Sequence, residues 1–173
     1  MPADKLVFID ESGATTAMQR LRGRSPRGER CRMSGPGGHW KICTMIGAVR
    51  LDGPLICTTL DGAVDQPSFA LWVNEHLCPV LRPGDVVCMD NLSSHKSLAT
   101  RKAIESAGAR LLYLPSYSPD FNPIEKLWSK VKEALRAAAQ RTVQAVGEAV
   151  SRALAAVTAQ DCHGYFTSCG YAI

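Results

Sequence analysis

The sequence predicts an α/β fold with a mixed five-stranded sheet flanked by helices. Three short apolar runs rich in β-favouring residues come first along the chain. Segments with helical periodicity then alternate with two further apolar runs of strand length. Consecutive strands followed by strand-helix-strand alternation indicate a sheet that is antiparallel in its first part and parallel in its second.

The first three strands are expected to form an antiparallel meander. LVFID (6–10) has the composition of a buried strand, and ESG follows it as a stop. The next two runs are WKICTMIGAVR (40–50) and PLICTTLDG (54–62). An Asp-Gly pair lies between these two runs, which favours a hairpin there.

Two more strands and four helices are predicted after the meander. The predicted segments are helix 67–82, strand 84–90, helix 96–108, strand 109–115 and helices 123–140 and 142–158. Pro67 suits a first helical turn, whereas Pro79 must end or kink the same helix. Gly108 and Thr142 are expected to cap their helices. This order of elements is also the order of the ribonuclease-H-like fold.

We expect residues 1–173 to form a single domain, with C-terminal helices over 123–158. The composition, 46% hydrophobic and 21% charged, is that of a globular protein. No apolar run approaches the roughly 20 residues that cross a bilayer, and the first residues lack the pattern of a signal peptide. The seven cysteines include no C-x-x-C pair, and most of them are expected as buried thiols. These features favour a cytoplasmic protein without a membrane partner.

An arginine-rich loop is predicted at 20–32, within a chain of net charge +4. RLRGRSPRGERCR carries six arginines against one glutamate: Arg20, Arg22, Arg24, Arg27, Arg30 and Arg32. Gly, Ser and Pro make this segment an extended arm, and its charge would be neutralised by phosphates with release of counterions. We therefore interpret it as a DNA-binding loop, and the alternative is a solvated, mobile loop.

Three acidic residues stand where an α/β sheet collects its chemistry. Asp10 ends the first predicted strand, Asp90 ends the fourth, and Glu125 lies in the first turn of a later helix. If the two strands are parallel neighbours, all three carboxylates meet at one edge of the sheet. Gathering three carboxylates is costly without a cation, and their oxygens suit Mg²⁺ or Mn²⁺. Two such ions, roughly 4 Å apart, would support an in-line attack on phosphate.

Capping and turn formation are the alternative explanations for these residues. Asn122 and Glu125 form an N-x-x-E pattern, a variant of the capping box, with Pro123 at the first helical position. Asp90 with Asn91 could simply shape a loop. The two readings of Glu125 differ in geometry. Capping needs its carboxylate turned back to the Asn122 amide, whereas metal binding needs it turned toward the two aspartates.

Four neighbouring residues are candidates for outer contacts with a ligand or substrate. Strand alternation should point Glu11 away from whatever Asp10 faces, so its role would be indirect at most. His95 follows Asp90 closely and could contact phosphate or a metal-bound water, or merely sit at the start of a helix. Asn91 and Asn122 border the predicted carboxylates and complete this set.

Three blocks of the sequence resemble the catalytic blocks of bacterial insertion-sequence transposases of the mariner superfamily. They are FIDESG (8–13), VVCMDNLSSHK (86–96) and LLYLPSYSPDFNPIEKLWSKVK (111–132), and GYFTSCGY (164–171) matches the family's closing run. Asp90 and Glu125 are separated by 34 residues, the spacing typical of this superfamily. The resemblance implies a ribonuclease-H-like fold in which Asp10, Asp90 and Glu125 form a metal-binding Asp-Asp-Glu triad.

The resemblance also implies an activity. It predicts Mg²⁺-dependent (or Mn²⁺-dependent) cleavage at the ends of an insertion sequence, and then attack of the freed 3′-hydroxyl on target DNA, typically at TA. Element ends and target DNA are the implied partners, in a homodimer or larger synaptic complex associated with the nucleoid. Family members usually carry a helix-turn-helix region ahead of this domain. Because the first strand begins at residue 6, that region is expected to be separately encoded, joined by frameshifting, or lost.

Two other functions fit the same residues. One is a degenerate transposase that acts only as a DNA-binding or assembly partner, although the intact triad speaks against it. The other is a ribonuclease-H-like nuclease that serves repair or RNA processing. Activity on an RNA-DNA hybrid would distinguish the nuclease from a transposase.

Overall fold

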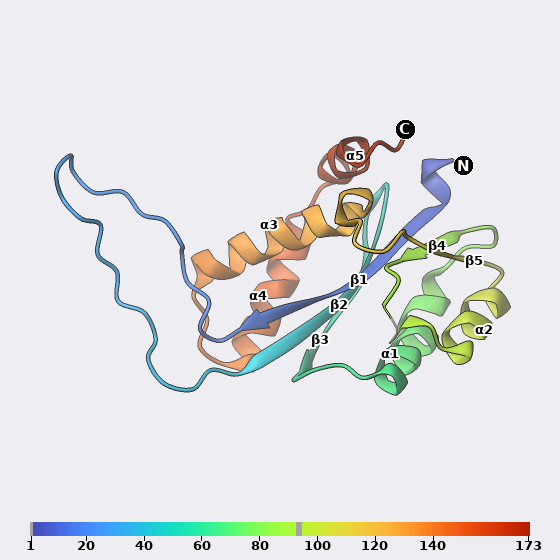
Figure 1. Ribbon diagram of the computed structural model, residues 1–173, viewed down its shortest axis with the longest axis horizontal. Coiled ribbons are helices and arrows are strands. Elements are labelled where there is room, and N and C mark those ends of the chain that lie inside the picture. The colour runs from blue at the N-terminus through green and yellow to red at the C-terminus, as the bar shows by residue number, and fades with distance from the viewer. Residues whose placement is uncertain (1, 93–94) are drawn as a thin grey trace.

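The computed structural model describes residues 2–92 and 95–173. In this part of the chain a five-stranded sheet has helices on both faces (Figure 1). The strands are β1 (Leu6–Thr15), β2 (Ile42–Arg50), β3 (Gly53–Asp61), β4 (Val86–Met89) and β5 (Arg110–Tyr113). Their order across the sheet is β3-β2-β1-β4-β5. The predicted mixed five-stranded sheet is confirmed.

The sheet changes from antiparallel to parallel at β1. β2 pairs antiparallel with both β1 and β3, which is the predicted meander. β4 pairs parallel with β1 and with β5. β1 is therefore the central strand, and its register with β4 decides which side chains meet at the ends of the parallel strands.

The predicted end of the first strand was wrong. β1 does not stop at Asp10 but continues through ESGAT to Thr15. Small and polar residues disfavour a strand locally, but β2 supplies a full antiparallel ladder as far as the pair Thr15 and Ile42. β4 has already ended by then, because its parallel pairing reaches only Phe8 with Cys88. Asp10 is thus a mid-strand residue that lies just past the end of β4.

The helices agree with the predicted segments except at the C-terminus. They are α1 (Gln66–Trp72), α2 (Leu98–Ser106), α3 (Pro123–Ala138), α4 (Val143–Ala155) and α5 (Ala159–Ser168). Short turns are η1 (Ala3–Lys5), η2 (Val73–Leu77), η3 (Cys78–Val80) and η5 (Pro119–Phe121). η2 and η3 continue α1 as a π and then a 3₁₀ turn up to Pro79, which confirms the predicted disruption. None of the described helices is long and apolar enough to cross a membrane.

The last helix, α5, was missed by the sequence analysis, which ended the helices at residue 158. Thr158 and Asp161 form a reciprocal capping box at its start. The Thr158 hydroxyl accepts from the Asp161 N–H at 3.1 Å, and the Asp161 carboxylate accepts from the Thr158 N–H at 2.9 Å. Lys130 on α3 also contacts that carboxylate at 2.6 Å. The residues of this capping box are therefore visible in the sequence. The ion pair between Asp161 and Lys130 also joins the start of α5 to α3.

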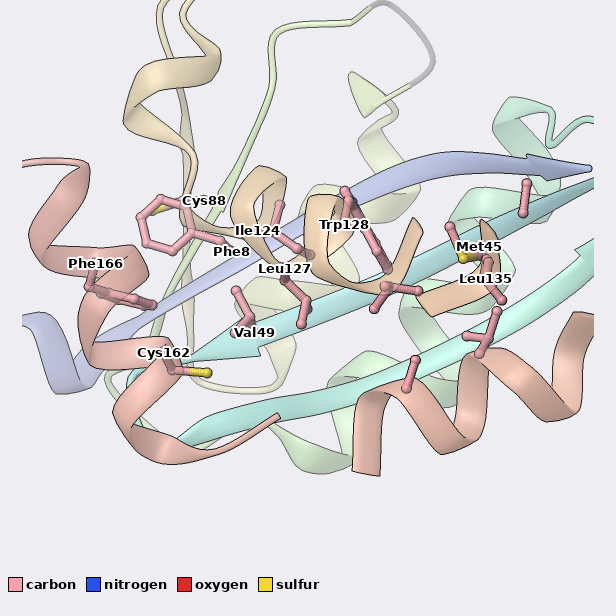
Figure 2. Packing of buried hydrophobic residues seen from close by; sticks show 14 of the residues in the cluster. Phe8, Met45, Val49, Cys88, Ile124, Leu127, Trp128, Leu135, Cys162 and Phe166 are labelled. Atoms are coloured by element: carbon pink, nitrogen blue, oxygen red, sulfur yellow. The ribbon is translucent and has the colours of Figure 1, made fainter. Parts of the chain in front are cut away.

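Two apolar clusters cover the two faces of the sheet. One joins β1, β2 and β4 to α3, α4 and α5, and Figure 2 shows Phe8, Trp128 and Phe166 within it. The other joins the opposite face to α1 and α2 and includes Ile9 and Phe69. Alternation along β1 sends Phe8 to the first cluster and Ile9 to the second. Asp10 therefore faces the side of α3, and Glu11 faces the side of α1.

The segment between β1 and β2 extends away from the body of the protein (Figure 1). Its base is tied down by the Arg141 guanidinium, which donates to the carbonyl of Thr16 at 3.2 Å and to that of Met18 at 2.9 Å. Beyond this base the side chains of residues 20–41 are exposed. The loop is thus anchored at its base and presents its side chains to solvent.

Candidate active site

Asp10 and Asp90 come from neighbouring parallel strands. Phe8 on β1 pairs with Cys88 on β4, so the same register continued by two residues brings Asp10 level with Asp90. Asp90 is the first residue after β4 and has a half-buried side chain, whereas Asp10 is 7% exposed. The sequence prediction that these two aspartates lie side by side depended on this pairing, which the structure contains.

Glu125 is brought to the same place by the packing of α3. The buried residues of α3 include Ile124, Trp128, Val131 and Leu135, at helical spacing on the face toward the sheet. Glu125 borders this stripe in the first turn and is exposed. The negative charge of Glu125 acts on Asp10, which indicates that the helix and strand bring these carboxyl groups into one electrostatic neighbourhood.

A pocket of about 270 Å³ is lined by all three carboxylates. Its wall also includes Asn91 after β4, and the segment between β5 and α3 with Tyr117 and Asn122. Asn91 donates to the Ser116 hydroxyl at 3.0 Å and so joins the loop after β4 to the loop after β5. Two strand ends and one helix start therefore converge on a single polar cavity.

The geometry of α3 distinguishes the two explanations of Glu125. The Asn122 N–H donates to the Pro119 carbonyl at 2.9 Å, so this amide is already occupied. The Asn122 side chain makes no capping hydrogen bond to the helix either. The capping box suggested by the N-x-x-E pattern is therefore not formed here, and the Glu125 carboxylate is free to line the pocket.

Asp10 has the electrostatics of a buried acid among other acids. Its pKa is raised to about 7, chiefly by burial and also by the charges of Glu125 and Asp90, against the lowering effects of a backbone hydrogen bond at Glu11 and of the charge of His95. A carboxyl with this pKa is half protonated near neutral pH. A cation bound in the pocket would favour its ionised form.

Asp90 is shifted in the opposite direction. Its partial burial acts to raise the pKa, but the hydrogen bond and charge of His95 outweigh this and lower it. His95 Nδ1 lies 2.5 Å from Asp90 Oδ1, and the Leu92 N–H donates to the same oxygen at 3.2 Å. Within the described residues Asp90 Oδ2 accepts no hydrogen bond. One oxygen of Asp90 is therefore engaged, while the other is available to a ligand.

Glu11 and His95 lie outside the pocket wall. Glu11 projects to the opposite face from Asp10, as strand alternation predicts, and its Oε1 is 3.5 Å from Nε2 of His95. His95 is fully buried behind Asp90. Burial lowers the pKa of His95, but the hydrogen bond with Asp90 and the charges of Asp90 and Glu11 outweigh it and raise the pKa to about 9. His95 therefore lies between the carboxylates of Asp90 and Glu11.

Tyr117 was not singled out from the sequence, and Asn122 was expected only as an outer contact without a particular geometry. Tyr117 is fully exposed and has a left-handed backbone, with φ of 56°. Asn122 is 3% exposed, and its Oδ1 is buried without a hydrogen-bond partner among the described residues. No local pattern predicts either feature, because both depend on how the loop 114–122 folds over the strand ends.

Residues 5–146 match the sequence profile of a family described as DDE superfamily endonuclease. The match covers most of the chain and contains Asp10, Asp90 and Glu125. The chain belongs to the DDE superfamily of endonucleases. Comparison with curated protein sequences gives no match.

Solved structures of the Mos1 mariner transposase share the fold of this DDE superfamily chain. The Mos1 strand transfer complex aligns with a TM-score of 0.76 at 20% identity, over 96% of this chain and 52% of the Mos1 chain. The Mos1 paired-end complex with Mg aligns with a TM-score of 0.74 at 21% identity, over 95% and 51%. The isolated Mos1 catalytic domain gives 0.67 at 16%, over 96% and 78%. The predicted ribonuclease-H-like fold is confirmed, and the chain spans about half the length of Mos1 in its DNA complexes.

The ligand atoms in the pocket decide which metal this DDE superfamily site would fit. Among residues 2–92 and 95–173, no group of three or more His, Cys, Asp or Glu is arranged to hold a metal ion. The pocket nevertheless offers only oxygen donors of the kind that Mg²⁺ and Mn²⁺ prefer, including the buried, unpartnered Oδ1 of Asn122. The chemistry of the donors thus fits a hard divalent cation, with water or substrate completing its shell.

The six arginines of the 20–32 loop are exposed in this DDE superfamily chain. Within the described residues none of them forms an ion pair. Arg20 and Arg22 border a groove that also includes Arg136 of α3. The positive charge predicted from sequence is therefore displayed on the surface and is not neutralised within the chain.

Proposed function

We propose that this chain is the catalytic domain of a mariner-like transposase that cleaves DNA at the ends of an insertion sequence and joins them to target DNA. The observation that carries the proposal is the convergence of Asp10, Asp90 and Glu125 on one pocket of a DDE superfamily fold. We treat residues 1–173 as a single catalytic domain.

The three carboxylates would hold Mg²⁺ or Mn²⁺, in our proposal two ions. The ions would supply activation of the attacking oxygen and stabilisation of the leaving oxygen. Structures of Mos1 paired-end complexes contain Mg or Mn, which supports this choice of metal. Two features of the described residues also support it: Oδ2 of Asp90 accepts no hydrogen bond from them, and the raised pKa of Asp10 is what burial near other carboxylates without a bound cation produces.

The residues of the chain have separate tasks in the proposed reaction. Asp10, Asp90 and Glu125 would hold the cations, and these would orient the scissile phosphate in the pocket that the three residues line. In the first step water attacks phosphorus, the bond from phosphorus to the 3′-oxygen breaks, and that oxygen leaves as a 3′-hydroxyl. In the second step this hydroxyl attacks a target phosphate. A bond forms between phosphorus and the 3′-oxygen of the element, the bond from phosphorus to the 3′-oxygen of the target breaks, and the target strand leaves with a 3′-hydroxyl. Target joining at TA is part of the proposal.

DNA binding is proposed for the arginine loop, Arg20 to Arg32. Its unpaired positive charges would contact phosphates and add affinity that depends little on sequence. The Mos1 structures named above are a strand transfer complex and paired-end complexes, which supports an assembly on DNA. We propose that this chain also works as a homodimer or larger synaptic complex, with end recognition supplied by a helix-turn-helix region.

Nicking of a supercoiled plasmid tests the proposed activity without knowledge of the element ends. Wild-type protein with Mn²⁺ should convert supercoiled DNA to the open circle, whereas Asp90→Asn and Glu125→Gln should lose at least about 10²-fold in rate. Glu148→Gln, an exposed glutamate of α4 away from the pocket, is the control and should keep the wild-type rate. Equal nicking by Asp90→Asn and wild type would overturn the proposal. Preference for an RNA-DNA hybrid over duplex DNA would point instead to a ribonuclease-H-like nuclease.

A further inference from the structure

His95 reaches two carboxylates from opposite sides of its ring. Nδ1 lies 2.5 Å from Asp90 Oδ1, and Nε2 lies 3.5 Å from Oε1 of Glu11. Glu11 belongs to β1 and projects to the face opposite Asp10, while Asp90 follows β4. The ring therefore links Glu11 on the central strand β1 to Asp90, which directly follows β4.

The ring of His95 is held in one orientation by its surroundings. It is fully buried and stacks on Phe69 of α1, with ring centroids 4.3 Å apart and an interplanar angle of 25°. The backbone is held as well, because the His95 N–H donates to the Leu92 carbonyl at 3.2 Å and the Tyr113 hydroxyl donates to the His95 carbonyl at 3.2 Å. A rotation of the imidazole would break the stack and both carboxylate contacts at once.

This fixed ring restricts the carboxylate of Asp90. A terminal carboxylate rotates broadly when nothing holds it. In this protein Oδ1 is held by His95 and by the Leu92 N–H, and within the described residues Oδ2 accepts no hydrogen bond. Asp90 also lines the pocket. The contacts therefore engage one oxygen and leave the other for a ligand.

We propose that His95 is a positioning residue that sets the carboxylate of Asp90 for metal binding, with the charge of Glu11 attracting the far side of the ring. This inference rests on the proposed function, because it assumes that Asp90 is a metal ligand. Groups that orient a metal ligand typically contribute 10–100-fold in metal affinity or activity. His95 would act through Asp90 and would not touch the substrate.

Simple packing is the competing explanation, and amide substitutions separate it from positioning. The side-chain amide of Asn can place its N–H near the position of Nδ1, whereas that of Gln reaches toward Nε2. If His95 only fills space against Phe69, His95→Asn and His95→Gln should behave alike. If it positions Asp90, only the Asn variant should restore the wild-type property.

Calorimetric titration with Mn²⁺ measures the effect without any DNA reaction. We expect His95→Ala and His95→Gln to weaken Mn²⁺ binding by about 10–100-fold, and His95→Asn to stay within about threefold of wild type. Glu11→Gln keeps an acceptor but loses the charge, so a smaller loss is expected. Asp90→Asn provides the reference for loss of a ligand. Thermal unfolding without metal shows whether each variant is folded, and the Asn and Gln comparison stands even if the Ala variant is not.

The outcomes separate this inference from the proposed function. If Asp90→Asn binds Mn²⁺ as wild type does, Asp90 is not a ligand and both proposals fail. If Asp90→Asn weakens binding while His95→Ala and His95→Gln do not, the metal site stands and the positioning role is overturned. Equal losses in the Asn and Gln variants would also overturn it, in favour of packing. In metal-free protein, NMR should show a slowly exchanging His95 Nδ1–H proton that Asp90→Ala removes, and its absence from wild type would contradict the contact.

Discussion

Trp128 on α3 packs directly over Gly47 on β2. A Cβ atom at position 47 would lie 2.6 Å from Cη2 of the Trp128 ring, closer than real contacts allow. Gly47 is also the residue of β2 that pairs with Asp10 of β1. The place where α3 rests on the sheet is thus the place where Asp10 lies, and Glu125 is one helical turn before Trp128. The contact between Trp128 and Gly47 therefore lies between the element that carries Glu125 and the part of the sheet that carries Asp10.

Gly47→Ala should therefore damage both stability and the site. We expect a loss of about 1–3 kcal/mol in the free energy of unfolding, because the buried indole must shift to admit the methyl group. Metal-dependent nicking should fall further than the stability loss explains, since Glu125 moves with α3. Chemical denaturation and plasmid nicking measure the two effects. Gly164→Ala on α5, with no atom within 4 Å of the added Cβ, is the control and should be neutral or stabilising. If Gly47→Ala is as stable and as active as wild type, the contact between Trp128 and Gly47 does not control the position of Glu125 relative to Asp10.

The buried Asp10 should make stability depend on pH and metal together. Its pKa rises from an unfolded value of 3.8 to about 7, so the folded state binds the proton more tightly. The contribution of Asp10 to stability is therefore largest at low pH, falls as pH rises from about 4 to 7, and stays low above that. Mn²⁺ replaces the proton, so the shift in unfolding temperature on adding Mn²⁺ should be larger at about pH 8 than at about pH 6.

The variant Asp10→Asn separates the pH dependence of stability that Asp10 causes from the pH dependence that His95 causes. The pKa of His95 is raised to about 9, so its stabilising contribution is full below 6.5 and is lost as pH rises through 9. Both groups make the protein less stable at higher pH, and only the Asp10 part should vanish in the variant. A Mn²⁺-induced shift that is equal at both pH values in wild type would contradict the assignment of the metal to Asp10.

Tyr117 combines a strained backbone with a fully exposed ring at the pocket. Left-handed backbone costs a non-glycine residue roughly 1–2 kcal/mol, and Asn tolerates it better than Tyr does. Tyr117→Asn should therefore raise the free energy of unfolding by about 0.5–1 kcal/mol. If the ring stacks on DNA, the same variant should bind DNA less well, whereas Tyr117→Phe should bind as wild type does. Denaturation and fluorescence anisotropy with labelled DNA measure the two quantities. Unchanged DNA binding in Tyr117→Asn would leave the strain without a functional role.

The arginine loop should dominate the salt dependence of DNA binding. Replacing Arg22, Arg24 and Arg27 together by Gln should reduce the slope of log K against log salt by about 2 to 3, because each phosphate contact contributes about 0.9. The loop is exposed and anchored from outside this triplet, so folding should be unaffected. Replacement of Arg101, Lys102 and Arg110 by Gln, also exposed but on α2 and β5, provides a control of equal charge. An unchanged slope in the loop variant would make the loop a solvated segment without contact to DNA.

The fold was predictable where periodicity and strand pairing agree. Ile124, Trp128, Val131 and Leu135 mark the buried face of α3 in the sequence, and the structure buries them. Strand alternation in the sequence also predicts that Glu11 points away from Asp10, and in the structure the two residues face opposite sides of the sheet. These signals are local, because they depend on the spacing of a few residues within one element.

The features of the fold and site that the sequence did not predict depend on contacts between distant elements. The extension of β1 to Thr15 comes from its ladder with β2, which no property of ESGAT indicates. The place of His95 depends on stacking against Phe69, 26 positions earlier in the chain. The Glu125 carboxylate is free to line the pocket because the Asn122 N–H donates to the Pro119 carbonyl instead. The prolines of this segment suggest such a turn but do not specify it. The missed helix α5 is different, because its capping pattern was present in the sequence.

Anomalous diffraction from crystals grown with Mn²⁺ tests the central claim most directly. The claim predicts Mn²⁺ peaks in the pocket, within about 2.1 Å to 2.3 Å of carboxylate oxygens of Asp10, Asp90 and Glu125. The ligand from Asp90 should be Oδ2, since Oδ1 is held by His95. Saturating Mn²⁺ bound elsewhere, with this pocket lacking a peak, would contradict the account.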